Sequence, residues 1–261
     1  MNDIKTFLSD AIIEDLFRPT GEALGLPGHL YADEFFAVER EHLFAKRWAV
    51  VAVGADLPLP GSVFPVDLAG WPLLLTRGSD GVIRCFYNIC RHRAMKLVAQ
   101  PGKGVSALHC PWHGWTYDLK GRLRGTPNLG GDYVNKDPKF DQEGIKLIEV
   151  GCAQWLDFIF VNIDGHAPDF ATYIEPLNAR LGGYALDHLH YAQSVPSSFE
   201  GNWKVFVEGA IENYHVPFAH PQLASGERSL DWRHELLGDC AASMSYRPQI
   251  VKQLGEGGSA L

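Results

Sequence analysis

Two short motifs, each holding one cysteine and one histidine, constrain this chain more than any other feature. Cys90 and His92 form a C-x-H motif, and Cys110 and His113 form a C-x-x-H motif that follows after seventeen residues. Two loops therefore each deliver one thiolate and one imidazole. A 2Fe-2S cluster with two cysteines on one iron and two histidines on the other uses this ligand set. The sequence thus predicts such a cluster, bound by these four residues.

A zinc site is the alternative reading of the same four residues, because zinc also binds two cysteines together with two histidines. Zinc sites of that composition usually pair Cys with Cys and His with His along the sequence, whereas each motif here supplies one of each. The pattern therefore favours the cluster. The chain holds five cysteines, an odd number, so a disulfide framework is not expected. The remaining three are expected to be buried free thiols: Cys85, Cys152 and Cys240.

The composition describes a globular chain without a nucleic-acid or membrane partner. Of the 261 residues, 46% are apolar, and 31 acidic against 23 basic side chains give a formal charge of -8. Binding to a nucleic acid or to an anionic membrane requires a run or patch of basic residues, and no basic run interrupts this acidic background. Residues 1–18 carry several acids and do not resemble a secretory signal, and no stretch reaches the roughly 18 apolar residues of a membrane helix. We expect a cytoplasmic protein.

The spacing of apolar residues predicts a helical beginning, a β unit and a second domain. Helical spacing marks Ser9–Phe17 and Asp33–Ala45, with Asp33 as the expected N-cap, and later Phe170–Leu181. Between them lie short β-branched and aromatic runs separated by Pro-Gly and Gly-Ser-Asp-Gly turns, which predict antiparallel strands. The predicted strands are Trp48–Val53, Ser62–Val66, Pro72–Thr76, Val82–Tyr87, Val105–His109, Trp115–Leu119, Lys146–Val150 and Phe158–Ile163. We therefore expect a helical segment at 1–45, a cluster domain at 46–165 and a further domain at 166–261.

The stretches C-R-H-R-A-M and C-P-W-H-G-W resemble the Rieske domain of ring-hydroxylating oxygenase large subunits. They are less similar to the Rieske proteins of respiratory complexes, in which each loop has an additional cysteine and the two form a disulfide. Met95 and Trp112 stand at those positions here. That family's serine donor is also missing, since Gly114 and Trp115 follow the last ligand. With few hydrogen bonds to the cluster sulfurs, we expect a potential near the lower end of about -150 to +300 mV.

A second candidate metal site lies in the segment from Asn202 to His220. His215 and His220 are about 140° apart on a regular helix, too far round to share one ion, but Pro217 between them is expected to break the helix. Glu212 precedes His215 by three residues and is expected to reach its imidazole. An H-x4-H pair alone fits two ordinary histidines as well. Its position after N-W-K and downstream of the cluster motifs favours iron binding.

This segment resembles the N-W-K and acid-x-Y-H-x4-H signature of the same oxygenases, in which two histidines belong to a 2-His-1-carboxylate iron site. The resemblance implies that His215 and His220 ligate iron, and that Glu212 bridges to the cluster histidine of a neighbouring subunit. Asn213, beside the iron histidine, is a candidate for positioning substrate. Most ring-hydroxylating members have aspartate where Glu212 stands. A glutamate resembles the carnitine, choline and glycine-betaine monooxygenase-type members, and implies a quaternary-ammonium substrate.

The family's carboxylate ligand lies well downstream of the two histidines. Here 41 residues follow His220, and no carboxylate among them stands where the resemblance places the ligand; these carboxylates are Glu227, Asp231, Glu235, Asp239 and Glu256. We therefore expect a C-terminally truncated sequence. The expected fold class is α+β: an antiparallel β Rieske iron-sulfur domain followed by the start of a helix-on-sheet, helix-grip-like catalytic domain.

The function that the resemblance implies is that of a Rieske oxygenase component. It uses dioxygen, and electrons that NAD(P)H supplies through a separate reductase or ferredoxin, to hydroxylate a small aromatic or quaternary-ammonium compound. The implied cofactors are the 2Fe-2S cluster and a mononuclear Fe(II), and the implied assembly is a homotrimer or an (αβ)3 complex. An electron-transfer module without a functional mononuclear iron site is the alternative. A zinc-binding interaction domain is a third hypothesis.

Overall fold

The structure is a computed structural model. It describes residues 4–19, 22, 24–135, 137–189, 191–212, 215–222, 231–238 and 240–246, without the side chains of 231–234 and 240–246. The chain forms two compact units. One contains Glu39–Ala167, and the other combines Met1–Val38 with Pro168–Leu261.

Antiparallel strands build the unit Glu39–Ala167. In its described residues six strands form one sheet in the order β1-β9-β8-β4-β3-β2. Their bounds are β1 Ala49–Val53, β2 Val63–Leu68, β3 Trp71–Arg77, β4 Ile83–Tyr87, β8 Glu149–Trp155 and β9 Phe158–Asn162. Ala69 and Gly70 connect β2 to β3 with φ of 50° and 85°, as a two-residue hairpin turn requires. The sequence thus encodes this register locally.

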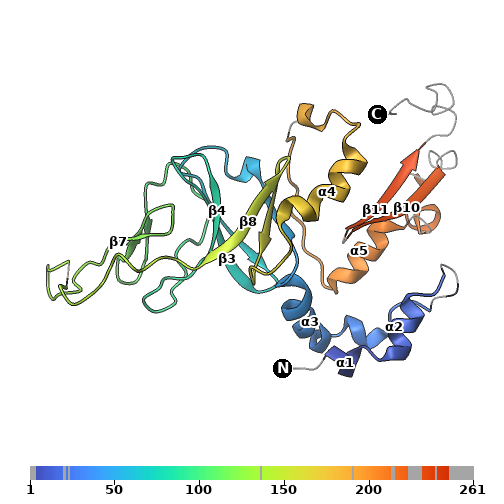
Figure 1. Cartoon of the computed structure of the whole chain (residues 1–261), viewed down its shortest axis with the longest axis horizontal. Helices are drawn as coiled ribbons and strands as arrows, with labels where there is room; N and C mark the ends of the chain where they lie inside the picture. The colour runs from blue at the N-terminus through green and yellow to red at the C-terminus, as the bar shows by residue number, and fades with distance from the viewer. Residues whose placement is uncertain are drawn as a thin grey trace. The chain divides into compact units, whose positions relative to one another are not determined.

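A smaller sheet of the same unit carries one of the two cluster-type loops. Its strands are β5 Leu108–His109, β6 Thr116–Tyr117 and β7 Leu123–Gly125, in that order. In Figure 1, β7 lies well apart from strand β8 of the large sheet. Strand β3 divides its buried side chains between two cores, as strand periodicity requires. Leu74 packs with the small sheet, whereas Leu73 and Leu75 pack in the core on the other side. The large sheet thus supports the loops on one face.

The helical segment at the start of the chain differs from its prediction. The expected single helix Asp33–Ala45 is an α-helix, α3, over Asp33–Glu39, which continues as a π-helical stretch, η2, over Arg40–Phe44. Asp33 is the first residue of α3 rather than its cap, because the carbonyl of Ala32 accepts the N–H of Phe36. The wider turn begins where the chain passes from one compact unit to the other.

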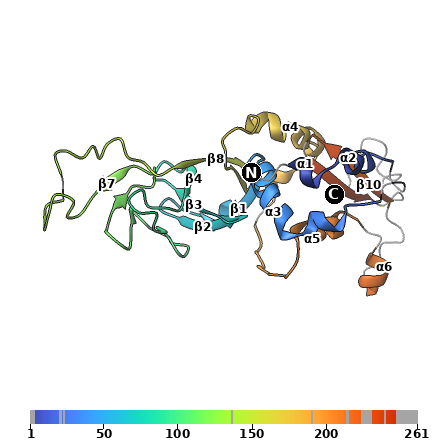
Figure 2. The ribbon, with the colours of Figure 1, turned by 90° about the horizontal axis from the view of Figure 1, so that it is seen from below.

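The second unit combines short helices with a hairpin, and Figure 2 shows α6 beyond the end of α5. Its core contains Leu30, Phe35 and Val38. The predicted helix Phe170–Leu181 is present with the same limits, and Arg180 on it bonds Glu235 on the hairpin at 2.9 Å. The helices are α1 Ile4–Phe7, α2 Asp10–Leu16, α4 Phe170–Leu181, α5 Trp203–Ile211 and α6 Val216–Ala219, with 3-10 turns η1 Gly28–Tyr31 and η4 Leu186–His188; the strands are β10 Asp231–Leu237 and β11 Cys240–Tyr246.

Antiparallel sheets together with separate helices confirm the expected α+β class. The remaining short turn in the β unit is η3, Gly54–Asp56. Across the part of the chain that the structure describes, no helix has the length and apolarity needed to cross a bilayer.

Candidate metal centres

The two cysteine-histidine motifs fold into loops with the same backbone hydrogen bonds. In the first loop, the N–H of Ala94 donates to the carbonyl of Cys90, and the N–H of Cys90 donates to Met95, at 3.0 and 2.8 Å. In the second, Gly114 donates to Cys110, and Cys110 donates to Trp115, at the same two distances. The residue four positions after each cysteine has a positive φ, 56° at Ala94 and 71° at Gly114. Equivalent turns therefore present both motifs.

The four side chains of these loops gather in pairs of one type. Cys90 and Cys110 are buried, and the Cys110 side chain lies within hydrogen-bonding reach of the Cys90 thiol. The His92 and His113 rings lie 4.6 Å apart at 71°. A cluster that places two cysteines on one iron and two histidines on the other needs this pairing. The donor set therefore fits a 2Fe-2S cluster.

Buried polar atoms at this site also fit a bound metal group. The Nδ1 atom of His92 is buried and has no hydrogen-bond partner among the described residues, which a metal bond would explain. Burial, and then the neighbouring His113, lower the pKa of His92, which favours the neutral imidazole that binds metals. Burial also raises the pKa of Cys90, so a coordinated metal is needed to keep that sulfur a thiolate at neutral pH.

Two tryptophans pack against the histidine pair. Trp115 stacks on His92 with ring centres 4.8 Å apart, and Trp112 stacks on His113 at 4.8 Å. Trp115 is buried, whereas Trp112 is 57% exposed. Trp115 therefore covers the His92 ring within the core that also contains Cys90 and Cys110, whereas Trp112 lies at the surface beside the partly buried His113.

Tyr117 is a functional residue that the sequence argument missed. Its hydroxyl lies 3.4 Å from the Cys90 sulfur and accepts the N–H of Arg91 at 3.1 Å, in a fully buried position. No serine follows the last motif residue, His113, because Gly114 and Trp115 stand there. Alternation along the strand was the available signal, because Tyr117 lies two residues after Trp115 and must face the same side. A hydroxyl at Cys90 raises the expected potential of a bound cluster above that expected from the missing serine alone.

The predicted iron histidines bracket one short helix. Helix α5 ends at Ile211, and His215 and His220 are the N-cap and C-cap of α6. Pro217 therefore does not break a long helix, as the sequence argument assumed; it lies in the first turn of α6, where no N–H donor is needed. The two rings lie 5.5 Å apart at 79°. With metal–nitrogen bonds of about 2.1 Å, rings that share an ion lie roughly 4.5 to 5.5 Å apart, so the pair fits one metal.

Glu212 contacts His215 as expected, but through different backbone geometry. The residue follows α5 in an extended conformation, so a turn rather than a helical face brings the side chains together. Its Oε1 lies 2.5 Å from His215 Nδ1, and its Oε2 accepts the backbone N–H of His215 at 3.2 Å. A carboxylate on Nδ1 fixes the ring and leaves Nε2 as the metal-facing atom, the usual arrangement around metal-bound histidines.

Several predicted residues of the second centre lie outside the part of the chain that the structure describes. Asn213 lies outside the described residues, as do Glu227 and Asp239. Among the residues that are described, no three His, Cys, Asp or Glu side chains converge on a single ion, so a carboxylate partner for the two histidines is not placed. Cys85 is a buried free thiol and Cys152 a partly buried one, and burial raises the pKa of both.

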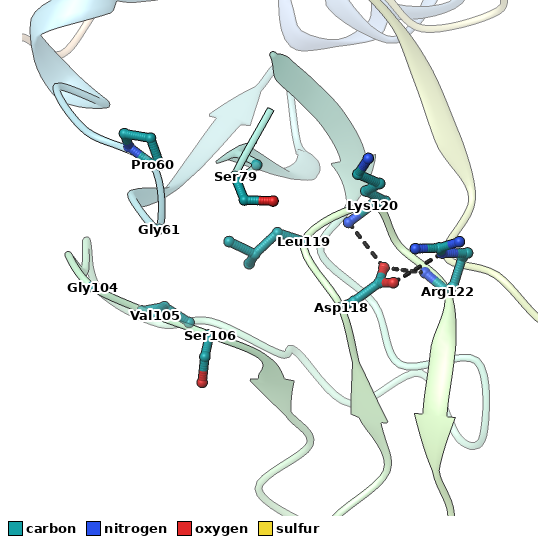
Figure 3. Close-up of a pocket in the computed structure, with 11 residues that line it drawn as sticks. Pro60, Gly61, Ser79, Gly104, Val105, Ser106, Asp118, Leu119, Lys120 and Arg122 are labelled. Atoms are coloured by element: carbon teal, nitrogen blue, oxygen red, sulfur yellow. Dashed lines mark hydrogen bonds and ion pairs between the residues drawn. The ribbon is translucent and has the colours of Figure 1, made fainter. Parts of the chain in front are cut away.

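A surface depression of about 440 Å³ lies in the β unit, away from the predicted ligands. The backbone of Gly61 and Gly104 and the side chain of Leu119 line it, as Figure 3 shows. Its charged groups already pair with acids. Lys120 Nζ bonds Asp80 at 2.8 Å, and Arg122 Nε bonds Asp118 at 2.9 Å. The depression thus offers no convergent set of reactive groups.

Comparison with known proteins places both candidate centres in recognised domains. Residues 47–138 match the Rieske 2Fe-2S domain, and residues 186–253 match the catalytic domain of ring hydroxylating alpha subunits. The glycine betaine monooxygenase oxygenase subunit of Pseudomonas aeruginosa is 30% identical over 241 residues, which cover 91% of this chain and 53% of the relative. The carnitine monooxygenase oxygenase subunit of Acinetobacter pittii is 33% identical over 200 residues, covering 74% and 51%.

Solved structures give the same result. The quaternary ammonium Rieske monooxygenase CntA in complex with L-carnitine has a TM-score of 0.70 at 29% identity, covering 83% of this chain and 60% of that one. Naphthalene 1,2-dioxygenase with bound indole has a TM-score of 0.65 at 25% identity, covering 76% and 45%. The chain spans about half the length of the curated relatives it matches, 53% and 51%.

Proposed function

We propose that this chain, which belongs to the family of Rieske oxygenase alpha subunits, serves an oxygenase component that hydroxylates a small quaternary-ammonium compound. The observation that carries the proposal is that one chain contains two sets of side chains suited to bind metal. One unit holds paired thiols and imidazoles, and the other holds two imidazoles at the ends of one short helix. An electron carrier needs the first centre alone.

In this proposal Cys90, His92, Cys110 and His113 hold the 2Fe-2S cluster, and His215 and His220 hold a mononuclear iron. The cluster supplies single electrons and the iron supplies oxygen activation when they are bound. The chain's own residues position these groups. Tyr117 donates to a cluster sulfur, Trp115 covers the His92 ring, and Glu212 holds the His215 ring in one orientation.

We further propose that Glu212 carries the connection between centres of neighbouring subunits, as the resemblance implies. Its Oε1 contacts His215, and its side chain is 42% exposed, so another group has room to approach it. The group proposed is the His113 ring of the next subunit in a trimer. The stacking of the exposed Trp112 on His113 supports this role, because that imidazole is only partly buried.

The substrate class rests on relatives and on one residue. The relatives at 30% and 33% identity are named for glycine betaine and carnitine, which are both quaternary-ammonium compounds. Glu212 is a glutamate at a position where most ring-hydroxylating members have aspartate, and this agrees with the same group. A separate reductase or ferredoxin is the proposed electron donor.

Metal content and turnover test the proposal together. An iron count of roughly three per chain supports the oxygenase, whereas roughly two supports an electron carrier. The reconstituted protein with a reductase should consume oxygen with glycine betaine, carnitine or choline. His215→Ala should abolish this turnover and leave the cluster spectrum intact. Loss of the cluster spectrum in His215→Ala would show that the two centres are not separate.

A further inference from the structure

The start of helix α5 is fastened to a segment from the beginning of the chain. The Asn202 side chain caps the helix by accepting the N–H of Lys204 at 3.0 Å, and its amide also donates to the carbonyl of Tyr31 at 3.0 Å. These residues are 171 positions apart in the sequence. Figures 1 and 2 both show the beginning of α3 beside α5. The helix that leads to the iron histidines is therefore anchored at its first turn.

The buried ammonium group of Lys204 strengthens this anchor. Lys204 is 7% exposed, and its Nζ lies 5.3 to 5.4 Å from the ring centres of Tyr31, Phe35 and Trp203. A cation at that distance over aromatic faces is attracted by the ring electrons, more strongly when water is excluded. Tyr31 and Phe35 belong to the segment from the beginning of the chain, so this cage of three rings around Lys204 joins that segment to α5.

One turn further along α5, Glu208 is held by the same early segment. The Tyr31 hydroxyl lies 2.7 and 2.9 Å from the two carboxylate oxygens of Glu208. Burial, and then the bond to Glu208, raise the pKa of Tyr31 to about 12, so the hydroxyl keeps its proton and donates at neutral pH. Four residues after Glu208 comes Glu212, whose side chain bonds His215.

We propose that Tyr31 is a positioning residue for the iron-binding segment: its hydroxyl holds Glu208 and so fixes the end of α5 from which Glu212 reaches His215. Helix α5 moves as a rigid rod over the three residues from Glu208 to its last residue, Ile211, or about 4.5 Å, so a shift at Glu208 is carried to the residue that directly precedes Glu212. The Glu212–His215 pair tolerates little movement, because hydrogen bonds weaken steeply away from good geometry. The inference rests on the proposed function, since it assumes iron at His215.

Ferrous iron binding to the full chain tests the inference without turnover. Fe(II) is titrated anaerobically into protein that retains its cluster, and nitric oxide serves as the paramagnetic probe of the mononuclear iron. We expect Tyr31→Phe to weaken Fe(II) binding by up to about tenfold and to alter the nitrosyl signal. Loss of a group that bonds a metal ligand directly costs about 10- to 100-fold, and Tyr31 acts on the ligand only through Glu208 and helix α5. The reduced-cluster resonance should stay unchanged. Tyr31→Phe keeps the ring over Lys204, so the cage remains.

Two Glu208 variants separate positioning from general stability. Glu208→Gln keeps an oxygen that accepts from Tyr31 and should bind Fe(II) as wild type does, whereas Glu208→Ala should resemble Tyr31→Phe. Phe7→Leu is the matched control, because Phe7 packs against Phe35 in the same core and its replacement lowers stability without touching Tyr31–Glu208. Its nitrosyl signal should equal that of wild type.

Three outcomes would overturn the inference. In the first, Tyr31→Phe has wild-type affinity and signal. In the second, Glu208→Gln is as damaging as Glu208→Ala. In the third, Phe7→Leu changes the nitrosyl signal as much as Tyr31→Phe does. A wild-type chain that gives no nitrosyl signal overturns the proposed function together with the inference, which distinguishes that failure from the others.

Discussion

Replacing Tyr117 by phenylalanine removes a hydroxyl that touches both a cluster cysteine and the cluster loop. The hydroxyl lies 3.4 Å from the Cys90 sulfur and accepts the N–H of Arg91. Because Tyr117 is fully buried, water does not replace the lost group. Reduction adds one negative charge to a cluster and its sulfurs, so a donor to Cys90 stabilises the reduced form more than the oxidised form. The variant should therefore have a lower midpoint potential.

The size of the shift follows from the strength of such a bond. Hydrogen bonds to charged groups contribute about 1.5 to 3 kcal/mol. If about 1 kcal/mol of this is gained on reduction, the potential falls by about 40 mV, because a one-electron couple changes by 59 mV for each factor of ten. The variant also leaves the N–H of Arg91 without its acceptor, which should lower the free energy of unfolding by about 1 to 3 kcal/mol.

A redox titration followed by the resonance of the reduced cluster measures this shift. Tyr87→Phe is the control, since Tyr87 packs in the core on the opposite side of the large sheet. It also loses a phenol hydroxyl from the same unit, and its midpoint should match wild type. An equal or higher midpoint in Tyr117→Phe would refute the reasoning. An equal fall in both variants would refute it too, since the effect would then not depend on the bond to Cys90.

Three further predictions concern the loops, the bridge and pH. Ala94→Gly should raise the free energy of unfolding by about 1 kcal/mol in thermal melts, because Ala94 has a φ of 56°; Gly114→Ala should lower it, since φ is 71° and the new Cβ would lie 3.2 Å from Pro127. Glu212→Gln should slow single-turnover electron transfer while metal analysis finds both sites filled; loss of iron would contradict this. Burial raises the pKa of Asp118, but hydrogen bonds from Arg122 and Arg124 outweigh this effect, so the pKa lies below its usual value. The stabilising contribution of Asp118 is thus present above the unfolded pKa of about 4 and is lost as pH falls through the lower folded value. Asp118→Asn should therefore differ from wild type in melting temperature at pH 7 and converge with it in acid.

Local features of the sequence were sufficient for much of the cluster unit. The ligand pattern of Cys90, His92, Cys110 and His113 gave the cofactor type, because two equivalent turns each need only a few neighbouring residues to form. Strands in runs rich in β-branched and aromatic residues were also predicted within one or two residues, as for Ala49–Val53 and Ile83–Tyr87. The strands beside the second loop are shorter than predicted, since pairing is confined to Leu108–His109 and Thr116–Tyr117. There the chain turns around the ligands instead of continuing the ladder.

The tertiary structure decided which distant groups meet. The alternation of apolar and polar residues predicts the face on which Tyr117 lies, but only the packing of the first loop against the small sheet places Cys90 at its hydroxyl. In the other unit, Pro217 indicated a helix break between the histidines, whereas α5 already ends at Ile211 and Glu212 reaches His215 by a turn. The bond from Tyr31 to Glu208 joins residues 177 positions apart. The periodicity of a helix or strand determines the face on which a side chain lies. Which side chain of another element it contacts is determined only by the packing of the two elements.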